Sequence, residues 1–374
     1  MSRSLFVAFA FVVAICAPLS WARQAQAYPQ FVLRGLGDCG SCHHSPYGGG
    51  LPNRWGRESL DVTFGADSDV GPGNDDLAYD PAHPTDIKVD LGVDLRLVPI
   101  YGKDSYTSWS TVIPMLTEVG GAVAVGRLTF YGTVTAKKIE GSGLPVVAFS
   151  REHWLKYELS AGTDIRAGRL VQPFGTRQPD HTQYLREDFG FDKFNQSYGV
   201  ELDLRREGWS LFGGVFAGDL THVPSERQER SVVLTPVLEL GGGAAVGLSA
   251  LGALSTARDR IAGSLFGRAP LGDRAYALAE IAAQHLSAND TDDTLSTIGE
   301  YLRLGWFVRP EMDLFLEGGH RAFLDADGLT KARLGLGMNW QVLRWFELAP
   351  QLLAEQRSNL GTRLVAFAQL HVVY

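Results

Sequence analysis

The sequence predicts an all-β protein in which an antiparallel transmembrane β-barrel of about sixteen strands follows a short N-terminal segment. Three observations carry this prediction. Long segments alternate between apolar and polar residues, and short Gly-rich turns alternate with longer polar connections. After residue 27 there is no run of ~18 apolar residues, the length that a membrane-spanning helix requires. A closed barrel is the other structure that satisfies its backbone hydrogen bonds within a bilayer.

The first 27 residues have the three parts of a secretory signal peptide. Arg3 supplies the basic region, residues 5–17 form the apolar region, and Ala25-Gln26-Ala27 is a small-x-small cleavage site. We therefore expect residues 1–27 to be removed on export through the inner membrane. The chain of 374 residues has a formal net charge of −8, and this acidic balance argues against a nucleic-acid partner.

The segment that follows, residues 28–57, contains the motif Cys39-Gly40-Ser41-Cys42-His43. The C-x-x-C-H pattern is typical of c-type haem attachment, because two thiols at this spacing bond the two vinyl groups of one haem. The motif predicts one covalent haem c, attached through Cys39 and Cys42, with His43 as the proximal iron ligand. A thioredoxin-like pair needs a βαβ context, and a structural zinc site needs four ligands. Neither condition is met locally.

The sixth iron position is open in the sequence. His83 is a candidate distal ligand, because it lies in the flexible stretch Asp80-Pro81-Ala82-His83-Pro84. Met115 falls in an expected strand, and an open or water-ligated position is the remaining alternative. His44 directly follows the proximal ligand, so we expect it to contact solvent or a haem propionate. Residues 58–86 are rich in Asp, Gly and Pro, which predicts an acidic linker.

The barrel is expected to occupy residues 87–374. Residues 87–97 place Ile, Val and Leu at every second position between Lys, Asp, Gly and Arg, which gives a strand one apolar and one polar face. The same pattern recurs at residues 200–204, 312–317 and 333–340. Many of these segments reach ten residues, the length of a tilted membrane strand.

Connections of alternating length support the same fold, since outer-membrane barrels have short periplasmic turns and longer outer loops. Short turns are expected near Gly120-Gly121, Ser160-Thr163, Arg205-Gly208, Gly241-Gly243, Leu271-Asp273, Arg309-Glu311 and Leu343-Arg344. Longer outer loops are expected at Gln172-Gln196, Gly218-Glu229 and Ser287-Thr294. Residues 364–374 alternate up to the terminal aromatic Tyr374, as expected of a last barrel strand, and would place His371 toward the lumen.

The N-terminal segment resembles the fused cytochrome–porins, outer-membrane proteins in which a short monohaem segment precedes a porin barrel. The similarity rests on Tyr28-Pro29-Gln30-Phe31 ahead of the C-x-x-C-H motif, and on Pro46, Gly48-Gly49-Gly50 and Gly56-Arg57 after it. The resemblance implies an outer-membrane location in a Gram-negative bacterium, with the haem segment in the periplasm or the lumen. It also implies contact with outer-membrane lipid, a periplasmic c-type cytochrome as inner partner, and an extracellular electron donor or acceptor, iron among them.

Two functional hypotheses follow. In the first, residues 28–57 enter the lumen as a haem-bearing plug and pass electrons between the cell exterior and periplasmic cytochromes. A haem on a periplasmic stub could not bridge a hydrocarbon layer ~30 Å thick. In the second, the protein is a passive diffusion porin whose haem segment is a plug or a sensor. A hydrolase is not indicated, because the chain has no nucleophile motif.

Overall fold

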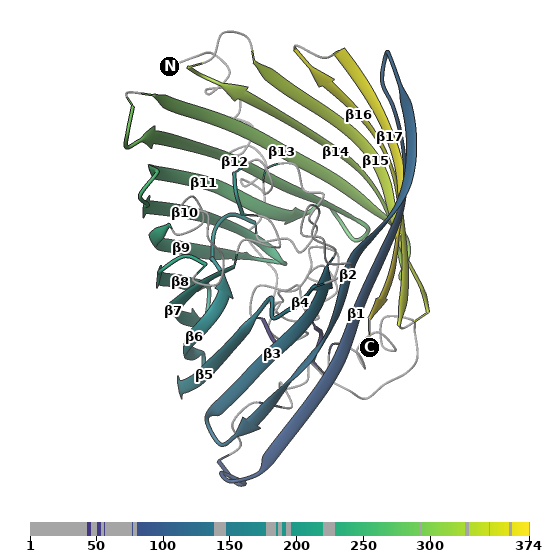
Figure 1. The fold of residues 1–374 in the computed structure, drawn as a ribbon. Coiled ribbons are helices and arrows are strands. Elements are labelled where there is room, and N and C mark those ends of the chain that lie inside the picture. Colours follow the sequence, from purple (N-terminus) through teal and green to yellow (C-terminus); the bar gives the residue numbers. More distant parts are fainter. Residues whose placement is uncertain are drawn as a thin grey trace.

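The structure is a computed structural model, and it describes residues 43–45, 51–53, 56, 77, 81–137, 147–176, 185, 189–191, 196–219, 229–291, 293–325, 329–343, 345–358 and 361–373. The predicted signal peptide, Cys39, Cys42 and most of the predicted linker lie outside these residues. The described strands form one continuous wall that curves around a central lumen (Figure 1). Within the described residues no helix is both long and apolar enough to cross a membrane.

Seventeen strands make up the wall: β1 (Ile87–Lys103), β2 (Ser108–Val125), β3 (Leu128–Lys137), β4 (Val147–Phe149), β5 (His153–Ser160), β6 (Thr163–Val171), β7 (Gln196–Arg206), β8 (Trp209–Phe216), β9 (Arg230–Gly241), β10 (Ala244–Leu254), β11 (Arg258–Pro270), β12 (Ala275–Ala288), β13 (Thr294–Arg309), β14 (Met312–Phe323), β15 (Thr330–Leu343), β16 (Phe346–Arg357) and β17 (Gly361–Val373). The short β4 and β5 both pair with β3, so they form one interrupted barrel strand. Counting these two as one reduces seventeen to sixteen, which confirms the predicted strand number.

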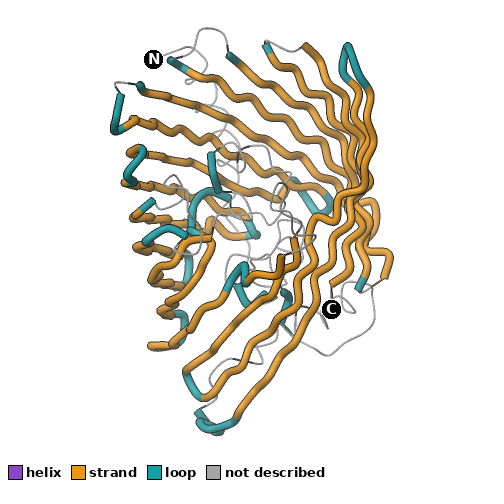
Figure 2. The backbone as a smooth tube through the Cα atoms, in the orientation of Figure 1, coloured by secondary structure: helices purple, strands orange, loops and turns teal. Residues whose placement is uncertain are grey.

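The sheet closes on itself between its first and last strands. β1 pairs antiparallel with β2 on one side and with β17 on the other, with Asp94 opposite Val373 and Lys103 opposite Leu364. All neighbouring strands are antiparallel. Figure 2 shows short turns joining several of the strands at the edges of the wall. The last strand, which the sequence placed at residues 364–374, is the strand that completes the barrel.

The two faces of the wall carry different side chains. On β1, Val89 and Leu91 are exposed on the outer face, whereas Asp90 and Asp94 are buried on the inner face. The outer face is apolar on many other strands too, for example at Val232 of β9. An apolar exterior around a polar interior is the pattern of a transmembrane barrel. The predicted alternation is therefore confirmed.

Most predicted turns fall where the structure has them, but the turn predicted at Gly120-Gly121 is wrong. Both glycines lie inside β2, opposite Gly92 and Leu91 of β1. The chain reverses instead at Gly126, whose φ of 57° lies in the left-handed region that favours glycine. A Cβ on Gly121 would come within 2.1 Å of the Asp90 carbonyl oxygen, so this glycine fits a close strand approach instead of a turn.

Candidate functional site

Charged side chains line the inner wall and are buried in ion pairs. Arg151, in the break between β4 and β5, donates from Nε and Nη2 to both oxygens of Glu118 at 2.7 and 2.8 Å. Arg166 of β6 pairs with Glu201 of β7. Charged side chains that lined a wide aqueous pore would be exposed to water. Because the side chains of these two ion pairs are buried, other parts of the chain cover this region of the inner wall.

The N-terminal segment supplies part of that cover. His43 forms an antiparallel bridge with Pro52, and the His44 amide donates to the Leu51 carbonyl at 3.3 Å. The His44 side chain is only 3% exposed, and its Nε2 lies 3.0 Å from Oδ2 of Asp90 on the inner face of β1. The residues directly after the C-x-x-C motif are thus fixed to the barrel wall.

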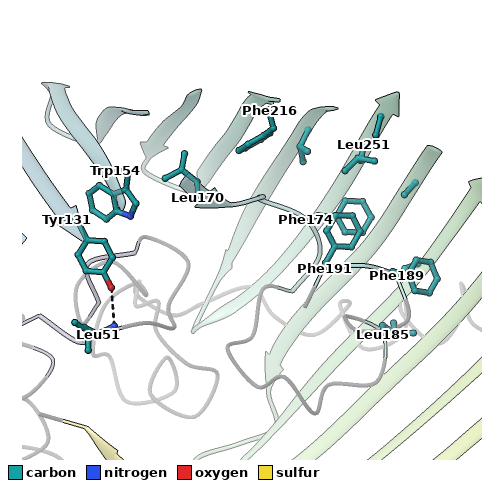
Figure 3. Close-up of a cluster of buried hydrophobic side chains, with 14 of the residues drawn as sticks. Leu51, Tyr131, Trp154, Leu170, Phe174, Leu185, Phe189, Phe191, Phe216 and Leu251 are labelled. Carbon is teal, nitrogen blue, oxygen red and sulfur yellow. Dashed lines mark hydrogen bonds between the residues drawn. The ribbon is translucent and has the colours of Figure 1, made fainter. Parts of the chain in front are cut away.

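Aromatic rings of β3 and β5 form the second attachment (Figure 3). The Leu51 amide donates to the hydroxyl of Tyr131 at 3.4 Å, and Leu51 is fully buried. The Tyr131 ring contacts the His44 ring with centroids 5.3 Å apart, and it stacks on Trp154 at 4.8 Å. His44 and Leu51 therefore lie inside the lumen, against β1 and β3, and Trp154 of β5 packs behind Tyr131.

The predicted site residues have different outcomes. His43 lies half-buried beside this attachment, whereas Cys39 and Cys42 are outside the described residues. The expected solvent contact of His44 is wrong, because the Asp90 carboxylate on the wall occupies its side chain. His83 lies in the turn before β1 with its side chain exposed, and its carbonyl accepts from the Asp86 amide at 3.3 Å. The structure does not bring His83 into the buried cluster around His44.

A second segment enters the lumen from the connection between β6 and β7. Its described residues Phe174, Leu185, Phe189 and Phe191 are buried, and Phe174 stacks on Phe191 with centroids 4.2 Å apart. Figure 3 shows these rings along the inner side of the wall. The sequence placed this connection among the outer loops and missed its inward fold. Its phenylalanines are the signal that marks it as buried.

Polar groups of β9 to β12 hold this connection. The Gly175 amide donates to Oγ of Ser249 at 2.9 Å, and Thr176 Oγ1 donates to Oε2 of Glu280 at 2.7 Å. Arg260 Nη1 donates to the Phe189 carbonyl at 3.0 Å. Thr235 Oγ1 donates to the carbonyl of Pro173. These bonds fix the connection to the wall that β9 to β12 form.

At the seam between β1 and β17, His371 points into the lumen as the sequence predicts. Its Nε2 lies 3.0 Å from Oδ1 of Asp94, and its Nδ1 lies 3.5 Å from Oε2 of Glu347. Asp94 also accepts from Nε and Nη2 of Arg96 at 3.0 and 2.8 Å. Among the described residues no group of three or more His, Cys, Asp or Glu side chains has metal-binding geometry. The network joins β1, β16 and β17.

Comparison with solved structures shows that the barrel is similar in fold to outer-membrane porins. A loop L8 deletion mutant of OmpT, an outer membrane protein of Vibrio cholerae, matches with a TM-score of 0.60 and 11% identity over 77% of this chain and 99% of that one. An anion-selective porin from Comamonas acidovorans gives the same score and identity over 77% and 100% of the two chains. The fold is that of an outer-membrane porin barrel.

The outer membrane channel DcaP of Acinetobacter baumannii has the same fold, with a TM-score of 0.55 and 12% identity over 79% of this chain and 99% of that one. No family model matches the sequence, and no curated protein matches it. At this level of identity the likeness extends to the barrel fold alone. Function has to be argued from the lumen and the N-terminal segment.

Proposed function

We propose that this chain is an outer-membrane electron-transfer protein of a Gram-negative bacterium, with one haem c carried on residues 28–57 inside the barrel. The observation that carries the proposal is that His44 and Leu51 are attached to the lumenal side of the barrel. His44 binds Asp90, and Leu51 binds Tyr131, so the residues beside the C-x-x-C-H motif are held within the wall. In this proposal the proximal ligand, His43, therefore has a fixed position in the lumen.

The residues present suit a haem at this place. Cys39 and Cys42 supply the thiols for two thioether bonds, and His43 supplies a neutral imidazole for the iron. A haem adds reversible one-electron chemistry at its iron. The chain holds the His43 backbone in its bridge to Pro52, and it places aromatic side chains beside the neighbouring His44. His83 lies exposed in the turn before β1, and its role as a distal ligand stays a prediction.

A lumenal haem also answers the problem of distance. The hydrocarbon layer is ~30 Å thick, and tunnelling falls steeply with separation. A haem held inside the barrel shortens the electron-transfer distance to the periplasm and to the cell exterior. We propose a periplasmic c-type cytochrome as the inner partner and an extracellular donor or acceptor, such as iron, as the outer partner.

The test uses the double variant Cys39→Ala with Cys42→Ala. We expect it to insert as a barrel, judged by heat-modifiable gel mobility, but to lose peroxidase-stained haem and electron exchange with ferricyanide outside the cell. The control Cys16→Ala lies in the predicted signal peptide and should retain both. If the double variant kept its electron exchange, the proposal would be wrong.

The passive diffusion porin is the second candidate, and the barrel fold favours it, because the matched proteins include an anion-selective porin. In this reading the N-terminal segment is a plug or a sensor. Planar-bilayer recording of the purified protein separates the two functions. A large, steady conductance with no electron exchange would support the porin, whereas low conductance with electron exchange supports the carrier.

A further inference from the structure

A carboxylate and an imidazole lie on the outer, membrane-facing side of the wall. A Cβ on Gly299 of β13 would collide with the Leu185 side chain in the lumen, so Gly299 faces inward. The next residue, Glu300, therefore faces outward, because successive side chains of a strand point to opposite faces. Glu300 is opposite His320 of β14 in the strand register, and both side chains are exposed. Within the described part of the chain neither side chain has a hydrogen bond or an ion pair.

These two residues, the Glu300–His320 patch, lie within the apolar band of the barrel. On the outer face of β13, Ile298 and Leu302 flank Glu300, and Trp306 is exposed near the short turn to β14. Exposed tryptophans near the strand ends are typical of the membrane interface. A strand that rises ~3.3 Å per residue with a tilt of ~45° places Glu300 about 14 Å from Trp306, well inside a band ~25 Å tall. A charge that faces lipid at this depth is costly, so the patch indicates a partner.

The backbone beside the patch leaves room for that partner. Gly318 precedes His320 on the outer face of β14, and a Cβ there would meet only the Arg333 carbonyl oxygen, at 3.8 Å. Glycines of the inner face differ, since a Cβ on Gly305 would collide with the Tyr276 ring. The described part of the chain therefore does not itself require glycine at position 318. Glycine weakens a strand and often marks a place where another backbone approaches closely.

We propose that a second copy of this chain binds the Glu300–His320 patch about a two-fold axis. Copies of an outer-membrane protein insert in the same direction, so the axis that relates two of them runs along the membrane normal. Glu300 and His320 are neighbours on adjacent strands, and a two-fold rotation exchanges their places. Glu300 of one copy then faces the partner's His320, and this contact occurs twice in the interface.

The chemistry of the patch suits this symmetry. A two-fold interface joins the same surface of both copies, so that surface must be complementary to itself, and an acid beside a base meets this condition. A three-fold ring instead joins two different surfaces. In the two-fold pair both side chains gain a partner and are removed from lipid.

Two reciprocal variants test the proposal. Glu300→His gives a chain with two imidazoles in the patch, and His320→Glu gives a chain with two carboxylates. Each variant expressed alone should insert, judged by heat-modifiable gel mobility, but should lose the two-chain mass that native mass spectrometry is expected to show for the wild type. The control Glu207→His, in the exposed turn between β7 and β8, should keep that mass.

Co-expression of the two variants with different affinity tags separates contacts between copies from contacts within one. We expect mixed pairs with one copy of each variant, because imidazole then faces carboxylate at both contacts across the interface. Within each variant chain the two groups carry charge of the same sign, so a pairing inside one chain would not be restored. Inserted variants that form no mixed pairs would overturn the proposal, as would a wild type that is a single chain or a three-chain assembly.

Gly318→Leu keeps both charged groups and decides the question if a charge variant does not insert. Leucine has room on the barrel's own backbone but should hold a second wall away, so the two-chain mass should be lost. Its control is Gly132→Leu on the outer face of β3, far from β14 in the strand order, where a Cβ would lie 3.6 Å from the Phe130 ring. The control should keep the two-chain mass. Loss in both glycine variants, or in neither, would contradict the proposed interface.

Discussion

On the wall formed by β1, β3 and β5, the N-terminal segment is held by the His44–Asp90 pair and by aromatic rings. On the wall formed by β9 to β12, the β6–β7 connection is held by side chains that bond its backbone, as at Gly175 and Phe189. Bonds from four strands fix the path of the connection along its wall, whereas the described part of the N-terminal segment is attached at His44 and Leu51. The connection is therefore held at more points than the N-terminal segment.

The largest effect is expected at His43. His43→Ala should keep covalent haem in a fraction of molecules, because the thioether bonds do not depend on it, but should change the reduced spectrum and the midpoint potential. His44→Ala should instead loosen the attachment to Asp90 and leave the iron coordination intact. Absorption spectra of the reduced proteins measure both. The assignment of the proximal ligand fails if the spectrum changes in His44→Ala and not in His43→Ala.

The next effect concerns the arginines of the two walls. Arg166→Ala removes the ion pair of the buried Glu201, and Arg260→Ala removes one of the two arginines of Glu229, which keeps Arg258 at 3.5 Å. Arg166→Ala should lower the free energy of unfolding by about 3–5 kcal/mol, and Arg260→Ala by less, measured by urea titration in detergent. The control is Arg309→Ala, whose side chain is 70% exposed and 3.9 Å from Glu311. Arg309→Ala should lower the free energy of unfolding by about 0–1 kcal/mol.

These arginine variants also distinguish the two walls. Arg260 bonds the Phe189 carbonyl, so only its loss should free the β6–β7 connection and raise the bilayer conductance. Equal conductance in Arg166→Ala and Arg260→Ala would show that the walls do not act separately.

A smaller effect is expected from the attachments themselves. Asp90→Ala leaves the buried His44 without its carboxylate, at a cost of about 1–3 kcal/mol. Thr235→Val removes the bond to the Pro173 carbonyl, at about 0.5–1.5 kcal/mol. Limited proteolysis should then cut near residues 43–53 in the first variant and in the β6–β7 connection in the second. Cleavage at the same place in both would contradict the comparison.

The smallest effect lies outside both walls, in the turn between β1 and β2. The backbone amides of Tyr106 and Thr107 donate to Oδ1 of Asp104 at 2.8 and 2.7 Å and hold the pKa of that carboxyl below its usual value. A lowered pKa means that the stabilisation is full above the unfolded pKa of about 3.9 and is lost as the pH falls through the folded value. Asp104→Asn should remove this pH dependence.

Urea titrations from pH 6 down to pH 2 measure the Asp104 effect. The stability advantage of the wild type over Asp104→Asn should shrink toward the acid end. A difference that stays constant over this range would rule out the carboxylate as its source.

The barrel was predictable because its signals are local. Alternation along β1 and the glycine at the β5–β6 turn, Gly162 with a φ of 69°, depend on a few adjacent residues. The error at Gly120-Gly121 has a physical cause, since glycine serves both tight turns and close strand approach, and sequence alone does not separate the two.

The lumen was harder to predict because its contacts join distant residues. Leu51 and Tyr131 are 80 positions apart, and no local pattern relates them. The bond between Thr176 and Glu280 spans 104 positions. The C-x-x-C-H motif did point to the segment that enters the lumen, although it could not identify the wall residues that receive it.

The central claim is that residues 28–57 carry a covalent haem c inside the barrel, and a haemochrome spectrum of the purified, folded protein tests it most directly. The account predicts one haem per chain, with the haemochrome bands of a haem attached through two thioether bonds, in protein that shows heat-modifiable barrel mobility. A folded barrel from cells competent in cytochrome c assembly that lacks these bands would contradict it.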